Sequence, residues 1–169
     1  MPYRLETRTF VPAPLPEVFG FFADARNLET ITPAFLRFKV LTPEVAMQVG
    51  ARIDYKLRLR GLPFRWQSEI TQWEPNVRFK DEQRRGPYHY WRHLHLFRED
   101  GDGTIVEDGV EYDVPGGSLV HQWLVSPELV RIFKYRQDAL ARIFGEDPRQ
   151  MGKVAILKLL LNGSARRRA

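Results

Sequence analysis

The chain has 169 residues, 43% of them hydrophobic and 28% charged, which is enough for one domain with a core or an internal cavity. It has no cysteine, which excludes disulfides, thiolate metal sites and cysteine nucleophiles. The net charge is +5, but residues 146–169 hold six Lys and Arg against two acids, so the remainder is nearly neutral and we expect no nucleic-acid partner. The first residues lack the apolar core of a signal peptide, and no apolar run approaches the roughly 18 residues of a membrane helix. We therefore expect a cytoplasmic protein without an integral membrane segment.

The beginning of the chain predicts one strand and two short helices. Residues 4–11 alternate and are rich in Thr and Arg, which predicts a strand at an edge of a sheet. Pro16 suits the first turn of a helix over residues 17–24, where its missing N–H costs nothing. A second short helix over residues 27–32 ends before Pro33.

Further strands then follow in a meander. Their expected ranges are 36–40, 52–60, 64–74, 78–83, 86–97 and 104–114. In the second of these, apolar residues from Ile53 to Leu59 alternate with charged ones, which is typical of an antiparallel sheet with one face in water. Trp73 falls on the charged side of its strand, so it is either exposed or marks a β-bulge.

A long helix is expected after the sheet. Ser126 is a candidate N-cap, the apolar spacing over residues 129–144 is helical, and Gly145 is a good stop. The apolar face is wide, so this helix is predicted to pack across the sheet. His121 and Trp123 precede it and are expected to pack its start against the sheet.

The chain divides into a ligand-binding domain over residues 1–145 and a basic extension over residues 146–169. Within the extension, the apolar run 154–161 predicts a short helix. Such a helix would pack on the body or on a second subunit, or would lie on a membrane surface with the Arg166–Arg168 cluster. We expect a monomer or a homodimer.

The order of elements predicts an α+β protein in which a curved seven-stranded antiparallel sheet wraps around a long C-terminal helix, with two short helices after the first strand. A straight helix cannot fill the concave face of a curved sheet, so a cavity is expected between them. This order, with the local sequences at 79–88, 91–97 and 108–115, resembles the START/polyketide cyclase-like (SRPBCC) superfamily, whose fold is the helix-grip fold. It is similar to a bacterial ligand-binding branch of unassigned activity. The resemblance covers residues 3–145 and implies a small hydrophobic ligand, lipid-like or polyketide-like, and no metal.

The histidine-rich strand at 86–97 carries the candidate site. Alternation places Trp91, His93, His95 and Phe97 on its inward face, and inward acids lie on the neighbouring strands. Buried acids need partners, so we expect a network of these acids with the histidines at the floor of an aromatic-lined pocket. The candidate catalytic residues are His93, His95, Asp108 and Asp81. The candidate ligand-binding residues are Tyr55, Trp66, Gln83, Trp91, His93, His95, Phe97, Asp108, Tyr112, Phe133 and Arg136.

Several roles stay open for these residues. They can bind a ligand, or simply satisfy buried polar groups and fix the strand register. His93 and His95 could share a metal with Asp108, although the expectation is no metal and no cofactor. A His/Asp pair with Tyr112 or Tyr55 could also transfer protons, as in a cofactor-free polyketide cyclase or dehydratase. A further alternative is an accessory protein that docks a partner or a membrane through residues 146–169.

Overall fold

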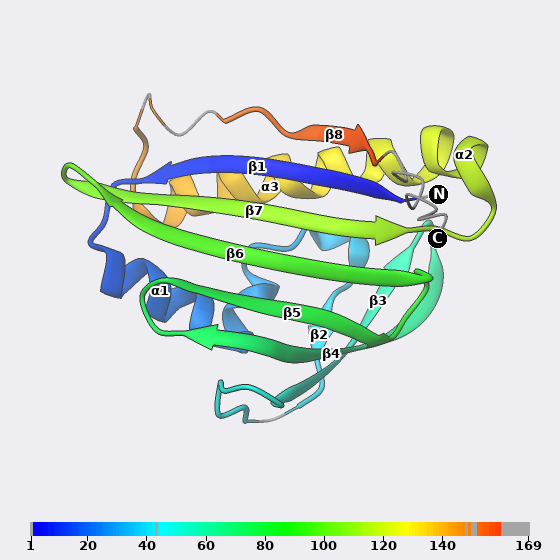
Figure 1. Cartoon of the computed structure of the whole chain (residues 1–169), viewed down its shortest axis with the longest axis horizontal. Helices are drawn as coiled ribbons and strands as arrows, with labels where there is room; N and C mark the ends of the chain where they lie inside the picture. Colours follow the sequence, from blue (N-terminus) through cyan, green and yellow to red (C-terminus); the bar gives the residue numbers. More distant parts are fainter. Residues whose placement is uncertain (1, 43, 148, 150–151, 160–169) are drawn as a thin grey trace, which may run out of the picture.

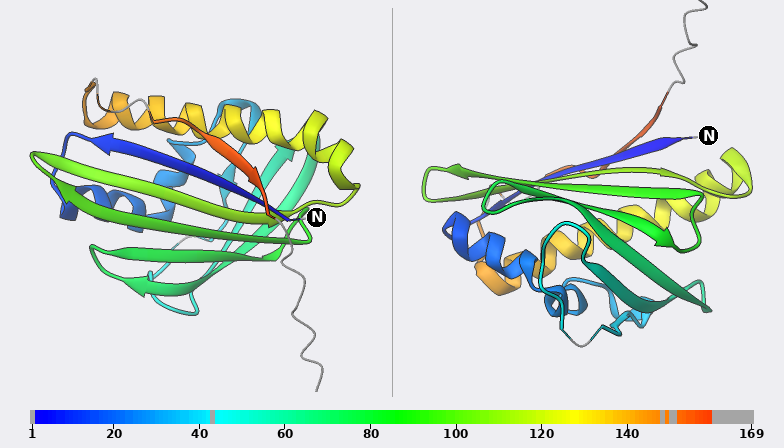
Figure 2. Two further views of the ribbon diagram at one scale, coloured as in Figure 1. Left: turned by 45° about the horizontal axis from the view of Figure 1, so that its top comes forward. Right: turned by 60° about the horizontal axis from the view of Figure 1, so that its bottom comes forward.

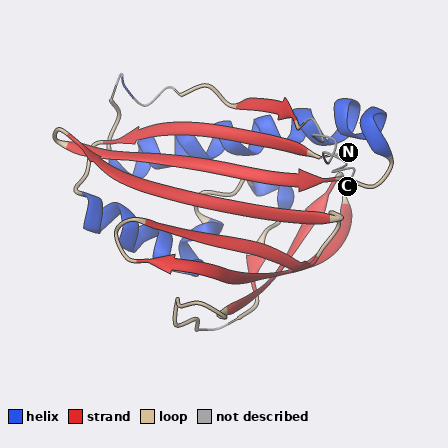
Figure 3. Ribbon diagram, viewed as in Figure 1, coloured by secondary structure: helices blue, strands red, loops and turns tan. Residues whose placement is uncertain are grey.

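The computed structural model describes residues 2–42, 44–147, 149 and 152–159. It is an α+β fold in which one antiparallel sheet carries a long helix on one face (Figures 1 and 3). The strands are β1 (Tyr3–Val11), β2 (Lys39–Val40), β3 (Arg52–Leu59), β4 (Leu62–Glu74), β5 (Arg78–Arg85), β6 (Tyr90–Asp100), β7 (Gly103–Asp113) and β8 (Ala155–Lys158). The helical segments are α1 (Leu15–Ala23), η1 (Ala25–Glu29), η2 (Ala34–Leu36), α2 (Gly117–Val120), η3 (His121–Val125) and α3 (Ser126–Phe144).

The sheet has the order β2-β3-β4-β5-β6-β7-β1-β8, and each neighbouring pair is antiparallel. Strands β2 to β7 form the expected meander, and the N-terminal strand β1 returns beside β7. The sheet curves around α3, while α1 and the short helices η1 and η2 lie at the end near β5 (Figure 2). The predicted curved sheet around a long C-terminal helix is confirmed. Among the helices that the structure describes, none is long and apolar enough to cross a membrane.

The alternation that predicted the inward face is confirmed in β3, β4, β6 and β7. In β3, Ile53, Tyr55 and Leu57 are buried, while the charged residues between them are exposed. In β6 the inward side chains from Trp91 to Phe97 are buried at every second position. Trp73 lies beyond a register shift between β4 and β5, and its ring packs against the core. The β-bulge alternative is therefore the correct one for that residue.

The long helical region starts earlier than predicted. The chain is already helical from Gly117, and η3 is a π-helical turn that leads directly into α3. Ser126 is therefore not the N-cap, and the wide turn before Pro127 accommodates the proline ring inside a continuous helix. This part shows no helical periodicity of apolar residues because Leu119 and Trp123 are exposed. The expectation that Trp123 packs the helix start against the sheet is wrong, since 70% of its surface is exposed.

The strand predicted at residues 36–40 is shorter than expected. Leu36 ends η2, and Arg37 has a left-handed backbone with φ 44°. Only Lys39–Val40 pairs with β3. A left-handed residue breaks the alternation of side chains, so the apparent period of two at 36–40 was not a strand signal.

The helix expected at 154–161 is also wrong, because Ala155–Lys158 forms β8 and pairs with the first half of β1. That half of β1 is therefore not an edge. The free N–H and C=O groups at a strand edge can form hydrogen bonds with a short apolar segment. The local sequence pattern of that segment does not reveal such pairing. The chain just before β8 lies close to β1 at Gly152, where a Cβ would clash with the carbonyl oxygen of Arg8. Gln137 Nε2 donates a hydrogen bond to the Gly152 carbonyl at 3.2 Å. Arg166–Arg168 and the end of the apolar run lie outside the described residues, and a domain boundary at 145 stays a prediction.

Candidate functional site

A cavity of about 160 Å³ lies between the concave face of the sheet and α3. Most of its wall is aromatic or aliphatic, and its polar groups come chiefly from the strands β4, β5 and β6 and from one helical arginine. The polar residues that line it are Ser68, Asp81, His93, His95, Arg136 and Thr32. Its aromatic wall includes Phe38, Tyr55, Trp66, Phe79, Trp91 and Phe133. The cavity expected from the curvature of the sheet is therefore present, with a polar floor.

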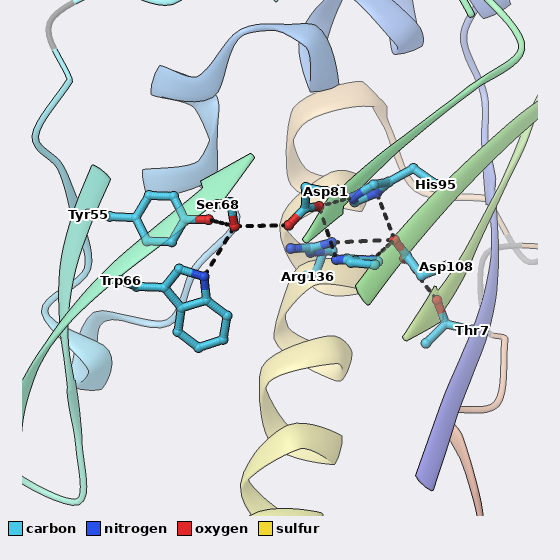
Figure 4. Close-up of polar contacts among 9 residues, drawn as sticks. Thr7, Tyr55, Trp66, Ser68, Asp81, His95, Asp108 and Arg136 are labelled. Carbon is cyan, nitrogen blue, oxygen red and sulfur yellow. Dashed lines mark hydrogen bonds and ion pairs between the residues drawn. The ribbon is translucent and has the colours of Figure 1, made fainter. Parts of the chain in front are cut away.

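Asp81 is the centre of one half of this floor (Figure 4). Its Oδ2 lies 3.2 Å from His95 Nε2, and its Oδ1 accepts a hydrogen bond from Ser68 Oγ at 3.1 Å. Ser68 in turn accepts from Trp66 Nε1 at 3.1 Å and from the hydroxyl of Tyr55. A chain of hydrogen bonds therefore runs from the aromatic wall to the histidine pair.

Asp108 is the centre of the other half, on the far side of the histidines (Figure 4). Its Oδ1 lies 2.8 Å from His93 Nε2, and its Oδ2 accepts from Thr7 Oγ1 at 3.0 Å. Arg136 Nη1 donates to the same Oδ1 from α3 at 3.5 Å. His95 Nδ1 is also 3.0 Å from this oxygen, but the oxygen lies off the direction of the N–H, so this is a close contact and not a hydrogen bond.

The register of three neighbouring strands produces this arrangement. Asp81 on β5 is directly opposite His93 on β6, and His95 is directly opposite Asp108 on β7. The hydrogen bonds run diagonally, from Asp81 to His95 and from His93 to Asp108. The two imidazole rings lie between the carboxylates with their centroids 3.7 Å apart, so each ring contacts the other.

Burial and charge act in opposite directions on these groups. Burial is the largest influence on both carboxyls and by itself raises their pKa, but the neighbouring imidazoles outweigh it, so the pKa of Asp81 is lowered and that of Asp108 is lowered further. Burial and then the charge on His95 lower the pKa of His93 to about 4. Burial also opposes charge on His95, yet the two carboxylates prevail and raise its pKa. His93 is therefore neutral at neutral pH, while the two carboxylates favour the charged form of His95.

The structure brings together most of the predicted site residues. Those that line the cavity are Tyr55, Trp66, Trp91, His93, His95, Phe133 and Arg136, together with the catalytic candidate Asp81. Asp108 does not line it and lies behind the two histidines. The acidic residue at the wall is therefore Asp81, and Asp108 supports the histidines from below.

Three other predicted ligand-binding residues lie away from the cavity wall. Gln83 Nε2 donates to the carbonyl of Tyr88, which ties down the turn before β6. Phe97 packs with the phenylalanines of α1, beyond one end of the cavity. Tyr112 is fully buried and bonds to His121 at the other end. Alternation identified their face correctly but not their position along the strand.

The sequence missed several residues at the cavity. Ser68 faces inward between Trp66 and Ile70, and a lone polar residue on such a face was an available signal. Met47 reaches the wall from an irregular segment, where no periodicity marks the inward side, and Phe38 lies just before the short strand β2. Tyr88 fell within the predicted strand 86–97 on the face opposite Trp91, whereas β6 begins only at Tyr90 and Tyr88 lies in the preceding turn.

Comparisons with known proteins agree with this geometry. A family model described as polyketide cyclase / dehydrase and lipid transport matches residues 11–141. The fold is similar to that of protein CV1439 from Chromobacterium violaceum, with a TM-score of 0.65 and 16% identity over 85% of this chain and 98% of that one. It is also similar to ginseng major latex-like protein 151 from Panax ginseng, with a TM-score of 0.64 and 12% identity over 85% and 97% of the two chains. A nucleoside-diphosphate sugar epimerase from Corynebacterium glutamicum matches with a TM-score of 0.57 and 22% identity, over 81% of this chain and 28% of that one. No curated protein matches the sequence.

Proposed function

The chain belongs to the polyketide cyclase, dehydrase and lipid transport family, and from this premise we propose that it binds a small hydrophobic molecule in the cavity beneath α3. One observation carries the proposal: an aromatic and aliphatic wall encloses a space whose polar groups are gathered at its floor. Small-molecule sites commonly have this form, with apolar lining and a few polar groups that orient the ligand. Cytoplasmic location, the lack of a nucleic-acid partner and a monomeric or dimeric state stay predictions.

The volume restricts the part of a ligand that the closed cavity can hold. An apolar protein cavity of about 150 Å³ binds benzene, and the cavity here measures about 160 Å³. A single aromatic ring or a short acyl segment therefore fits without rearrangement. A longer lipid-like or polyketide-like molecule exceeds this volume, so part of it would lie outside the cavity or would displace the short helices or α3.

The polar floor favours a ligand with an oxygen at one end. Arg136 lines the cavity, its guanidinium lies 5.1 Å from the centre of the Phe133 ring, and within the described part of the chain its buried Nε has no hydrogen-bond partner. A buried donor without a partner is costly. A carbonyl, enolate or carboxylate oxygen of a ligand would supply the missing acceptor.

Two substitutions on α3 test this proposal. Ile132 lines the cavity, while Ile143 is exposed on the same helix and does not line it. Ile132→Trp should fill the cavity and abolish the rise in melting temperature that benzoate or toluene gives the wild type, whereas Ile143→Trp should preserve it. Native mass spectrometry of freshly purified wild type and both variants gives a second readout of any bound molecule. A wild type that neither retains a molecule nor responds to these probes would contradict the proposal.

A second candidate is a cofactor-free cyclase or dehydratase, favoured by the orientation of His93. Its Nε2 is held by Asp108, its Nδ1 lies 3.9 Å from Asp81 Oδ2, beyond hydrogen-bond distance, and the ring lines the cavity. A histidine so placed can accept a proton from a carbon next to a carbonyl. Incubation with a poly-β-ketone that also cyclises spontaneously should shift the products toward one ring pattern, and His93→Asn should remove the shift. An unchanged product pattern with wild-type protein would eliminate this candidate.

A further inference from the structure

We infer that His93, His95 and Asp81 form a binding site for one divalent first-row transition-metal ion at the floor of the cavity. Their ligand atoms all lie within 4.8 Å of one another. Asp81 Oδ2 is 3.2 Å from His95 Nε2 and 3.9 Å from His93 Nδ1. Metal bonds of about 2.0–2.2 Å to nitrogen and oxygen place neighbouring ligand atoms about 3–3.5 Å apart. Small side-chain adjustments therefore suffice to bring the three atoms to one ion.

A second observation, independent of the distances between the three ligand atoms, is the carboxylate of Asp108 behind the two histidines. Asp108 Oδ1 takes the hydrogen bond of His93 Nε2 and also contacts His95 Nδ1, so it lies on the side of each ring away from Asp81. With the protons on those two nitrogens, the lone pairs of the other two point toward Asp81. Histidine ligands of metals usually donate their second N–H to a carboxylate in this way.

The remaining carboxylate oxygens are also held. Ser68 donates to Asp81 Oδ1 and leaves Oδ2 for an ion, while Thr7 and Arg136 hold Asp108. Hydrogen bonds to a second group therefore hold Asp81 and His93, while Asp108 contacts His95 without one. A network that served only to satisfy buried polar groups would not keep His93 Nδ1 at 3.9 Å from Asp81 Oδ2, beyond hydrogen-bond distance.

The environment determines what the ion could do. Asp81, His93 and His95 all line the cavity, so the coordination positions not taken by protein face the place where a ligand would lie. Two histidines and one carboxylate with open positions suit iron(II), zinc(II) or cobalt(II) better than calcium or magnesium. Together with Arg136, which lines the same cavity, the ion would attract an anionic or polarised ligand oxygen.

Cobalt(II) titration of untagged protein, stripped of metal with a chelator, tests this inference directly. We expect one cobalt per chain, with visible absorption bands typical of nitrogen and oxygen coordination, and displacement by one equivalent of zinc. His93→Gln and His95→Gln should each weaken binding at least 100-fold, and Asp108→Asn should weaken it about 10- to 100-fold. His89→Gln is the matched control, because its side chain is exposed on the turn before the same strand, and it should bind as the wild type does.

Folding of each variant is checked by near-ultraviolet circular dichroism before the titration, and any variant that does not fold is replaced by Asp81→Asn. Failure of the folded wild type to take up stoichiometric cobalt or zinc would overturn the inference. Binding that survives in the His93→Gln/His95→Gln double variant would also overturn it. Neither result affects the cavity proposal, whose readout is the response of the Ile132 and Ile143 variants to apolar probes.

Discussion

Two sites with buried histidines, one with His121 and one with His93 and His95, pack on the same sheet. They differ in whether the histidines line the cavity. His121 stacks on the ring of Tyr3, and its Nε2 shares a hydrogen bond with the Tyr112 hydroxyl at 2.9 Å. This cluster does not line the cavity. His93 and His95 are equally buried, but they line the cavity and lie between two carboxylates.

The comparison shows that burial alone does not mark a functional histidine. Protein interiors satisfy nearly all polar groups, so a group left without a partner beside a cavity needs its own explanation. Within the described residues, the floor of the cavity has such groups in Arg136 Nε and His95 Nδ1. His121 stacks on Tyr3 of β1 and bonds to Tyr112 of β7, which fits a role in holding the start of the helical region to these two strands.

The largest loss of stability in either region is expected when Asp108 is replaced. Asp108→Ala removes the partner of His93, Thr7 and Arg136 together and should lower the free energy of unfolding by about 3–5 kcal/mol. Asp108→Asn keeps the shape and one acceptor oxygen and should cost less. Urea unfolding of both variants measures this, and a loss below about 1 kcal/mol for Asp108→Ala would mean that the carboxylate does not hold the network.

A smaller loss is expected in the His121 cluster. Tyr112→Phe removes one buried hydrogen bond and leaves His121 Nε2 without its partner, so it should cost about 1–3 kcal/mol. Because Tyr112 lies away from the cavity, the response to toluene and benzoate should equal that of the wild type. A variant that unfolds as the wild type does but loses its response to those probes would reverse the roles assigned to the two regions.

The pH dependence of stability should also reveal the contribution of His121. Burial disfavours its imidazolium, so its pKa in the folded protein is lowered from 6.5. Below pH 6.5 the unfolded chain therefore binds more protons, and the contribution of this residue to stability, full above pH 6.5, is lost as the pH falls toward the lowered folded-state pKa. His121→Gln should lose less stability than the wild type between pH 7 and pH 5. Identical pH profiles in urea unfolding would show that His121 does not contribute.

The smallest effect is expected at Trp123, next to the His121 cluster in sequence. Its side chain is exposed on η3, so Trp123→Gln should change the free energy of unfolding by less than about 0.5 kcal/mol. Thermal and urea unfolding measure this. A loss above about 1 kcal/mol would indicate that the indole packs on the protein after all.

The sequence predicted which face of each strand is buried, because alternation depends only on local geometry. It could not predict how far along each strand the cavity extends, so Phe97 and Tyr112 were placed in the site although they pack beyond its two ends. It also could not predict β8, since that strand forms by pairing with β1, which lies far away in the chain. The sequence also could not predict that Asp81 lines the cavity and Asp108 does not. Both face inward, and only the positions of α3 and Thr7 decide which one is covered.

The central claim is that the cavity beneath α3 holds a ligand whose polar end meets the floor. A crystal structure of the protein soaked with benzoate tests it most directly. The account predicts density for the ring against the aromatic wall, with a carboxylate oxygen about 3 Å from the Arg136 guanidinium. A solid core, with side chains occupying the space above His93 and His95 and no ligand density, would contradict it.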